Sequence, residues 1–229
     1  MFAGFGCGGS KKAARKVSNI QLLDSIILLD SRAYPIVTKD FEMFDFDAYE
    51  KRTQRITLPD GIVIDIDVSL SGSYEGIYFE IFHPNSYFSL LKHFRLDGTL
   101  KCKGLLHVRG FDKGVWLYFD ELGNLTKEEN LDEPFIYTFE DILKFCRRRN
   151  IRVEKGFYSR DSANWPSNLL ATHIYRECLE EECKWIVQHV KQTRRNFLGN
   201  LILETITIDG KTGKMLSKRQ TRIEEGGHL

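Results

Sequence analysis

The chain has 229 residues, enough for one large domain or two small ones, each with a buried core. Its 33 Lys and Arg against 32 Asp and Glu give a formal net charge of +1, so no overall field draws it to nucleic acid or to anionic lipid. Hydrophobic residues make up 42% and aromatic residues 12%, which indicates a globular protein rich in strand-forming residues and excludes disorder for most of the chain.

The first 33 residues are predicted to form a Gly-rich, basic start followed by one short helix. Ser18 and Gln21 have the spacing of a capping box. The apolar residues that follow recur at helical spacing, and they are Leu22, Ile26 and Leu29.

Cys7 bears on the cellular location of the chain. It stands where a lipoprotein signal could end, but the basic start and the apolar core of ~7 to 15 residues that such a signal needs are missing before it. The longest aliphatic run, Ile26 to Leu29, is far shorter than the ~20 apolar residues of a membrane span. The sequence therefore predicts a cytoplasmic protein without a transmembrane segment, and the alternative is a lipid anchor at Cys7 if translation starts upstream.

The cysteines do not form a recognisable framework. Their number is odd and no Cys-x-x-Cys pair occurs, which suits neither a disulfide scaffold nor a zinc ribbon. We therefore expect reduced and mostly structural thiols at Cys7, Cys102, Cys146, Cys178 and Cys183.

From Tyr34 to about Leu131, short apolar and aromatic runs such as 62–68 and 77–82 alternate with turn residues. Turns at intervals of roughly 8 to 12 residues predict an antiparallel β meander. The clearest internal similarity is between Phe94–Leu100 and Phe119–Leu125, which both read Phe, three residues, Gly, one residue, Leu. We interpret this unit as a hairpin in which Gly98 and Gly123 adopt the positive φ of the turn, with 57–63 as a degenerate third copy.

Residues 92–104 and 114–125 together resemble the MORN-variant repeats of bacterial antitoxin-like and immunity proteins. The most specific part is the Gly-x-Trp-x-Tyr-x-Asp segment that begins at Gly114. Residues 44–49 and 135–146 resemble flanking parts of such proteins, so the resemblance covers roughly residues 41 to 150. It implies a structural scaffold and neutralisation of a toxin, although only two clear repeats are present, and a shared repeat does not fix a function.

The last part of the chain reads differently. Thr138 can cap a helix whose apolar stripe is Phe139, Ile142, Leu143 and Cys146, and the Arg147–Arg149 run then complements the dipole at its C-terminus. Pro166 is predicted to start a second helix that runs to about Glu182, with Leu170, Ile174 and Cys178 on one face. A strand at 185–190 and a hairpin of 201–208 with 214–219 follow, and this order resembles small PepSY-like modules.

The predicted fold class is therefore α+β, with an antiparallel β meander of MORN-like hairpins followed by a helix and a small C-terminal α+β module. The predicted domains are the start and short helix in residues 1–33, the meander with its terminal helix in 34–155, and the PepSY-like module in 156–229.

No catalytic, cofactor-binding or metal-binding residue is predicted. The 210–214 segment fails as a phosphate loop, because its glycines are too close together and Met215 follows the lysine. The six histidines lack metal-ligand spacing. His173 would lie one helical turn from Glu177 or Cys178 but lacks an orienting partner and an oxyanion hole. Cys102 is interpreted as structural, with its neighbouring lysines on the opposite face of the strand.

Acidic pairs are frequent, and the clearest are Asp45 with Asp47, Asp65 with Asp67, and Asp120 with Glu121. A pair two residues apart on a strand shares one face, as a glycosidase pair would, but the interpretation favoured here is a solvated face opposite the core-directed Phe46 and Ile66. Glu180–Glu182 form a further acidic run. Such acids suit a basic protein partner, because complementary charge speeds encounter.

The leading functional hypothesis is a non-catalytic protein-binding module of the immunity or antitoxin type, with a protein partner, no cofactor and no nucleic acid. One alternative is an enzyme with a carboxylate or Cys/His site assembled from residues that are distant in the sequence. Another is a structural lipoprotein of the cell envelope. A pocket in which titratable groups converge would favour the enzyme.

Overall fold

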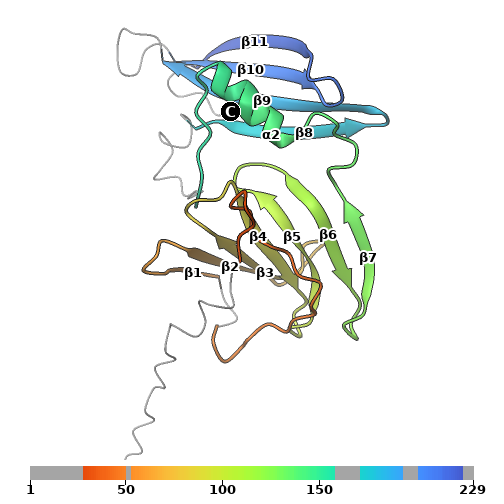
Figure 1. Ribbon diagram of the computed structural model, residues 1–229. Helices are drawn as coiled ribbons and strands as arrows, with labels where there is room; N and C mark the ends of the chain where they lie inside the picture. Colours follow the sequence, from red (N-terminus) through yellow and green to blue (C-terminus); the bar gives the residue numbers. More distant parts are fainter. Residues whose placement is uncertain (1–27, 50–52, 158–170, 193–200, 224–229) are drawn as a thin grey trace, which may run out of the picture.

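The computed structural model describes residues 28–49, 53–157, 171–192 and 201–223, which hold eleven strands and one helix. The strands form two antiparallel sheets (Figure 1). The large sheet contains β1 (Gln54–Thr57), β2 (Val63–Ser69), β3 (Gly76–Phe82), β4 (Phe88–Phe94), β5 (Leu100–His107), β6 (Asp112–Phe119) and β7 (Leu125–Asn130). After helix α2 (Phe139–Arg148), the small sheet contains β8 (His173–Leu179), β9 (Glu182–Gln192), β10 (Leu201–Asp209) and β11 (Met215–Ile223).

The large sheet is a meander in which every strand pairs with its neighbours in the sequence. Three of its turns share one hydrogen-bond pattern, in which a backbone N–H donates to the carbonyl four residues later and a Gly N–H closes the turn. The glycines have φ of 83°, 92° and 86° at Gly61, Gly98 and Gly123. The predicted hairpin turns at Gly98 and Gly123 are therefore confirmed, and the turn at Gly61 has the same geometry.

One face of the large sheet is covered by the N-terminal segment, residues 34–49. Phe44 contacts the rings of Phe79 and Phe94, with centroids 6.2 and 5.6 Å apart. Lys103, whose side chain is 1% exposed, is bonded beneath this segment to Glu42 at 2.8 Å, and Lys92 binds the same carboxylate. Phe46 is 44% exposed, so its expected core position is wrong, whereas Ile66 is fully buried as expected.

Helix α2 begins as predicted. Thr138 and Asp141 form a capping box, in which each side chain accepts a hydrogen bond from the other residue's backbone N–H. The buried side of the helix carries Phe139, Ile142 and Cys146. Arg147 and Arg148 occupy its last turn, where positive charge is favourable.

The predicted helix from Pro166 to Glu182 is wrong, because residues 173–179 form strand β8. The spacing of Leu170, Ile174 and Cys178 explains the error: positions four residues apart lie on one face of a helix and equally on one face of a strand. The described residues thus form a β-rich fold with one short helix, which corrects the α+β class. The strand at 185–190 and the hairpin that follows are confirmed within β9, β10 and β11.

The expectation of reduced thiols throughout is also wrong. Cys178 and Cys183 form a disulfide between directly paired positions of β8 and β9. The sequence analysis did not predict this bond because it placed Cys178 on a helix, where Cys178 would not face Cys183 across a pair of strands. The described cysteines outside this bond, Cys102 and Cys146, are buried and free, while Cys7 and most of the predicted first helix lie outside the described residues. Leu29, at the end of that helix, forms an isolated bridge with Pro35 instead.

The small sheet lies across one end of the large sheet, with α2 against it (Figure 1). A shared core fills the junction, where Phe111 of the β5–β6 turn meets the Trp185 ring of β9 at 5.1 Å and Phe88 of β4 meets Phe139 of α2 at 5.1 Å. The Trp185 indole N–H donates to the carbonyl of Tyr137 at 2.7 Å. The two sheets therefore depend on one hydrophobic core.

Trp116 packs on the face of Gly104, and this contact yields a stability prediction. The Trp116 side chain is 6% exposed, as predicted, and a Cβ on Gly104 would lie 2.4 Å from its ring. Trp116→Ala should lower the free energy of unfolding by about 3 to 5 kcal/mol. Gly104→Ala should also destabilise the wild type, but much less in the Trp116→Ala background, because the ring that it strikes is then gone. Urea unfolding measures both, and additive effects of the two substitutions would contradict this packing.

The burial of His107 leads to a prediction of how acid changes the stability of the fold. It is 1% exposed and stacks on Phe111, and burial lowers its pKa to about 3. The unfolded chain, with a His pKa of about 6.5, binds this proton while the folded chain does not, so stability falls as pH drops from about 6.5 toward 3.

We expect urea titrations between pH 6.5 and 5 to show a shallower loss of stability for His107→Phe than for the wild type. Phe preserves the stacked ring and does not titrate. Equal slopes for the two proteins would contradict the prediction.

Candidate functional site

The structure does not bring the histidine, the cysteines and the 210–214 segment discussed above together into a catalytic site. His173 lies on β8 and stacks on Tyr175, while Cys178 is held in the disulfide, so the one-turn Cys/His pair does not exist. Burial raises the pKa of Cys102 to about 11, in keeping with its structural interpretation. Met215 begins strand β11, so residues 210–214 belong to a hairpin turn and its edge.

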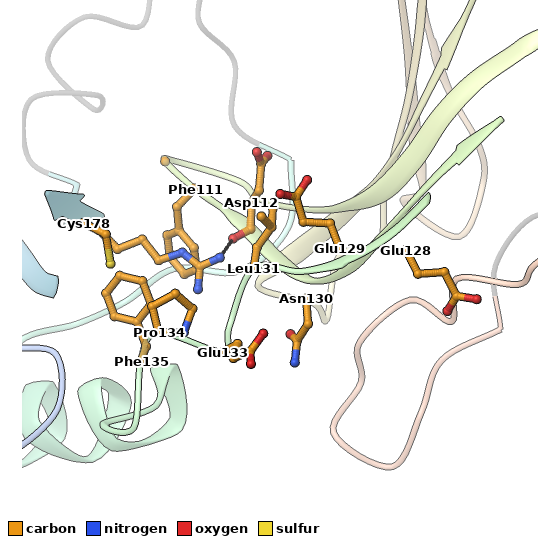
Figure 2. Close-up of a pocket in the computed structure, with 12 residues that line it drawn as sticks. Phe111, Asp112, Glu128, Glu129, Asn130, Leu131, Glu133, Pro134, Phe135 and Cys178 are labelled. Atoms are coloured by element: carbon orange, nitrogen blue, oxygen red, sulfur yellow. Dashed lines mark hydrogen bonds between the residues drawn. The ribbon is translucent and has the colours of Figure 1, made fainter. Parts of the chain in front are cut away.

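One hollow, of about 740 Å³, lies at the junction of the two sheets, and we refer to it as the cleft. It is built by the start of β6, the end of β7, the β7–α2 connection and the edge strand β8 (Figure 2). Its lining is Gly110, Phe111, Asp112, Glu128, Glu129, Asn130, Leu131, Glu133, Pro134, Phe135, Arg176 and Cys178. Apolar rings thus lie beside carboxylates.

Arg176 is the cation of this lining, and it is fully engaged. Its guanidinium lies 5.0 and 4.9 Å from the ring centroids of Phe111 and Phe135, and its Nη1 donates to Asp132 at 2.7 Å. Its Nη2 donates to the backbone carbonyl of Asp112. Rings and two acceptors fix the guanidinium, whose side chain is only 8% exposed. Arg176 therefore builds the cleft wall, and its charge is already balanced by Asp132.

Asp132 holds two buried cations at once. Its second oxygen accepts from Lys113 at 2.7 Å, and the Lys113 side chain is 10% exposed. Burial alone would raise the pKa of Asp132, but the hydrogen bonds and charges of Lys113 and Arg176 lower it overall. On the far side of Lys113, Glu140 of α2 lies 3.9 Å away and accepts from the Tyr34 hydroxyl. We call these residues, with Arg176, the junction network.

The carboxylates at the mouth of the cleft differ in their partners. Glu128 pairs with Lys39 at 2.5 Å, and Glu129 accepts from the Tyr118 hydroxyl at 3.0 Å. In the described part of the chain, neither the Asp112 nor the Glu133 carboxylate forms an ion pair. Burial raises the pKa of Asp112, and the nearby charge of Arg176 offsets this only in part. Asp112 and Glu133 are thus the carboxylates that a cationic ligand would neutralise.

A second hollow, of about 580 Å³, lies on the face of the large sheet opposite the N-terminal segment, and we refer to it as the groove. Asp65 and Glu80 face each other directly across β2 and β3. Asp65 is bonded to Arg55 at 3.1 Å, and Glu80 accepts from the hydroxyl of Ser89 at 2.5 Å. Ser89 is fully buried, so no substrate reaches that hydroxyl.

The described ranges contain no cluster of three or more His, Cys, Asp or Glu side chains arranged to hold a metal ion. None of their helices has the length and apolar character needed to cross a bilayer.

Comparisons with protein-family models, with curated proteins and with solved structures found no match for this chain. The resemblance to MORN-variant and PepSY-like proteins therefore stays a prediction.

Sequence reasoning missed the cleft because its parts are distant along the chain. The residues joined by the Arg176–Asp132 bond are 44 positions apart, and those joined by the Arg176–Asp112 bond are 64 apart. One local signal was available: Ile174, Arg176 and Cys178 are two residues apart, and residues at that spacing share one face of a strand. Reading that pattern as a helix concealed the role of Arg176.

The junction network predicts that Asp132→Asn is strongly destabilising. It leaves two nearly buried cations without their shared anion, and we expect the free energy of unfolding to fall by about 2 to 4 kcal/mol, since the carboxylate is itself partly exposed. The matched control is Glu182→Gln, which removes an exposed partner of Lys184 and should leave stability unchanged. Similar unfolding curves for both variants would show that the network contributes little.

Proposed function

We propose that the protein is a non-catalytic protein-binding module whose cleft receives a cationic segment of a partner protein. The observation that carries this proposal is the cleft itself, where Asp112 and Glu133 form no ion pair with any residue that the structure describes, while the lining cation Arg176 is already bound to Asp132. A Lys or Arg side chain entering the cleft would meet Asp112 and Glu133 and would pack its stem on Phe135 and Pro134.

The rigidity of the cleft supports a binding role. Its walls belong to two sheets with a common core, and Arg176 is fixed by rings and hydrogen bonds. A preformed site loses little conformational entropy when a partner docks. Standard protein interfaces bury roughly 1,200 to 2,000 Å², which the cleft together with the adjoining edge strands β7 and β8 can supply.

The resemblance to antitoxin and immunity proteins gives the partner its most specific identity. We propose a basic toxin, such as a nuclease whose substrate-binding surface is cationic, encoded by a neighbouring gene. An acidic cleft suits such a partner because it presents the opposite charge to the surface that it must block.

The compartment is part of the proposal. A cytoplasmic location and a lipid anchor at Cys7 were the alternatives from the sequence. Disulfides persist in oxidising compartments and are rare in the cytosol, so the Cys178–Cys183 bond favours the cell envelope or the exterior.

The binding proposal predicts a specific effect of charge removal. The doubly substituted protein Asp112→Asn/Glu133→Gln should bind the neighbouring gene product at least about tenfold more weakly, which corresponds to ~1.4 kcal/mol. Co-purification and calorimetric titration measure the change, and growth rescue on co-expression tests neutralisation. The control, Asp67→Asn/Glu121→Gln, removes the same charge outside the cleft and should retain the wild-type affinity.

The runner-up is a carboxylate enzyme acting in the groove, which the facing pair Asp65 and Glu80 favours, because opposed carboxylates are the arrangement of glycosidases. A hydrolytic turnover that Glu80→Gln abolishes, with no partner recovered, would replace the binding proposal with this one.

A further inference from the structure

The Cys178–Cys183 disulfide closes the outer end of the β8–β9 hairpin. The two residues are direct partners in the sheet, and only four residues, Leu179 to Glu182, separate them. Cys178 also lines the cleft, next to the wall formed by Arg176. The bond is therefore a covalent feature of the cleft wall.

The two sulfur atoms are placed differently. Cys178 is exposed, whereas Cys183 is 4% exposed and belongs to the shared core. The Cys183 carbonyl also accepts a hydrogen bond from the Gly210 N–H at 2.7 Å, which holds this residue against β10. A thiolate attacks one sulfur in line with the S–S bond, so access decides which sulfur reacts. Cys178 is therefore the exposed half of the bond, and we expect a thiolate from solvent to attack its sulfur.

The charges around Cys178 select among attacking thiols. Glu177, Glu180 and Glu181 are exposed, and in the described ranges none of them forms an ion pair. Lys184 binds Glu182 at 2.9 Å and lies directly opposite Glu177 in the sheet, so it offsets part of this negative charge. Asp112 and Glu133 lie along the same cleft. This negative field repels an anionic thiolate and repels it less when the thiol carries a positive charge.

We propose that the Cys178 sulfur is a thiol–disulfide exchange site that takes cationic thiols, such as a cysteine flanked by basic residues. The proposal stands whether or not the cleft binds a protein.

The exchange balances without any further reagent. The thiolate RS⁻ forms a bond to the Cys178 sulfur, the bond between Cys178 and Cys183 breaks, and Cys183 leaves as a thiolate that takes a proton from water. A second RS⁻ attacks the R sulfur, which releases RSSR and the Cys178 thiolate. Two thiols are thereby oxidised to one disulfide, and the protein disulfide is reduced to two thiols.

The test compares three thiols on the full-length protein carrying Cys7→Ser, in which Cys102 and Cys146 are the remaining free thiols and are buried. Cysteamine, 2-mercaptoethanol and glutathione react as thiolates of net charge zero, −1 and −2. The rate constant of each thiol with the protein is expressed per thiolate and divided by its rate constant with a small neutral disulfide. This relative rate removes the differences in intrinsic reactivity among the three thiols. Mass spectrometry of peptides locates the mixed disulfide.

The expected result is an adduct on Cys178, with relative rates in the order cysteamine, 2-mercaptoethanol, glutathione. The differences among these relative rates, which we call the spread, should be largest at an ionic strength of about 10 mM, where the Debye length is about 30 Å. At about 1 M the spread should nearly vanish. The spread should also shrink in Glu177→Gln/Glu180→Gln. An adduct on Cys183, reaction only after unfolding, free thiols at both positions, or a spread indifferent to salt and to these substitutions would overturn the proposal.

Discussion

The Arg176–Asp132 ion pair is the interaction on which the arrangement of the described residues depends. A guanidinium that is 8% exposed is tolerated only where its charge is balanced and its N–H groups have acceptors. Asp132 meets this requirement from the connection between the large sheet and α2, while Arg176 itself belongs to the small sheet. The bond therefore fixes the path of that connection against β8, and Lys113 ties the same carboxylate back to β6.

The cleft follows from this constraint. Because Arg176 and Lys113 are both committed to Asp132, the mouth of the cleft keeps carboxylates that no buried cation neutralises. The apolar part of the lining has the same origin, since Phe111 and Phe135 enclose the guanidinium and present their remaining surface to the hollow. A site with fixed rings and unpaired carboxylates is suited to holding a cationic side chain.

What could be predicted from the sequence was local. The hairpin turns at Gly98 and Gly123 could be predicted because only a few residues separate the paired strands. The start of α2 at Thr138 could be predicted because a capping box spans one helical turn. The predicted fold class was wrong because of β8. Apolar residues four positions apart fit both a helix and a strand, so their spacing alone could not distinguish the two structures. The same error at β8 hid the disulfide and the contacts of Arg176, and a second reason applies to them as well. Each requires the register of strands that the sequence does not specify pairwise, and Arg176 meets its acceptors only in the folded chain.

The most direct test of the account is hydrogen–deuterium exchange of the wild type with and without the partner protein, or with an arginine-rich peptide in its place. Binding at the cleft predicts slower exchange in the peptides that cover residues 110–112, 128–135 and 174–178, which build the cleft, and unchanged exchange around the groove residues 65–67 and 78–82. Protection confined to the groove, with none at the cleft, would contradict it.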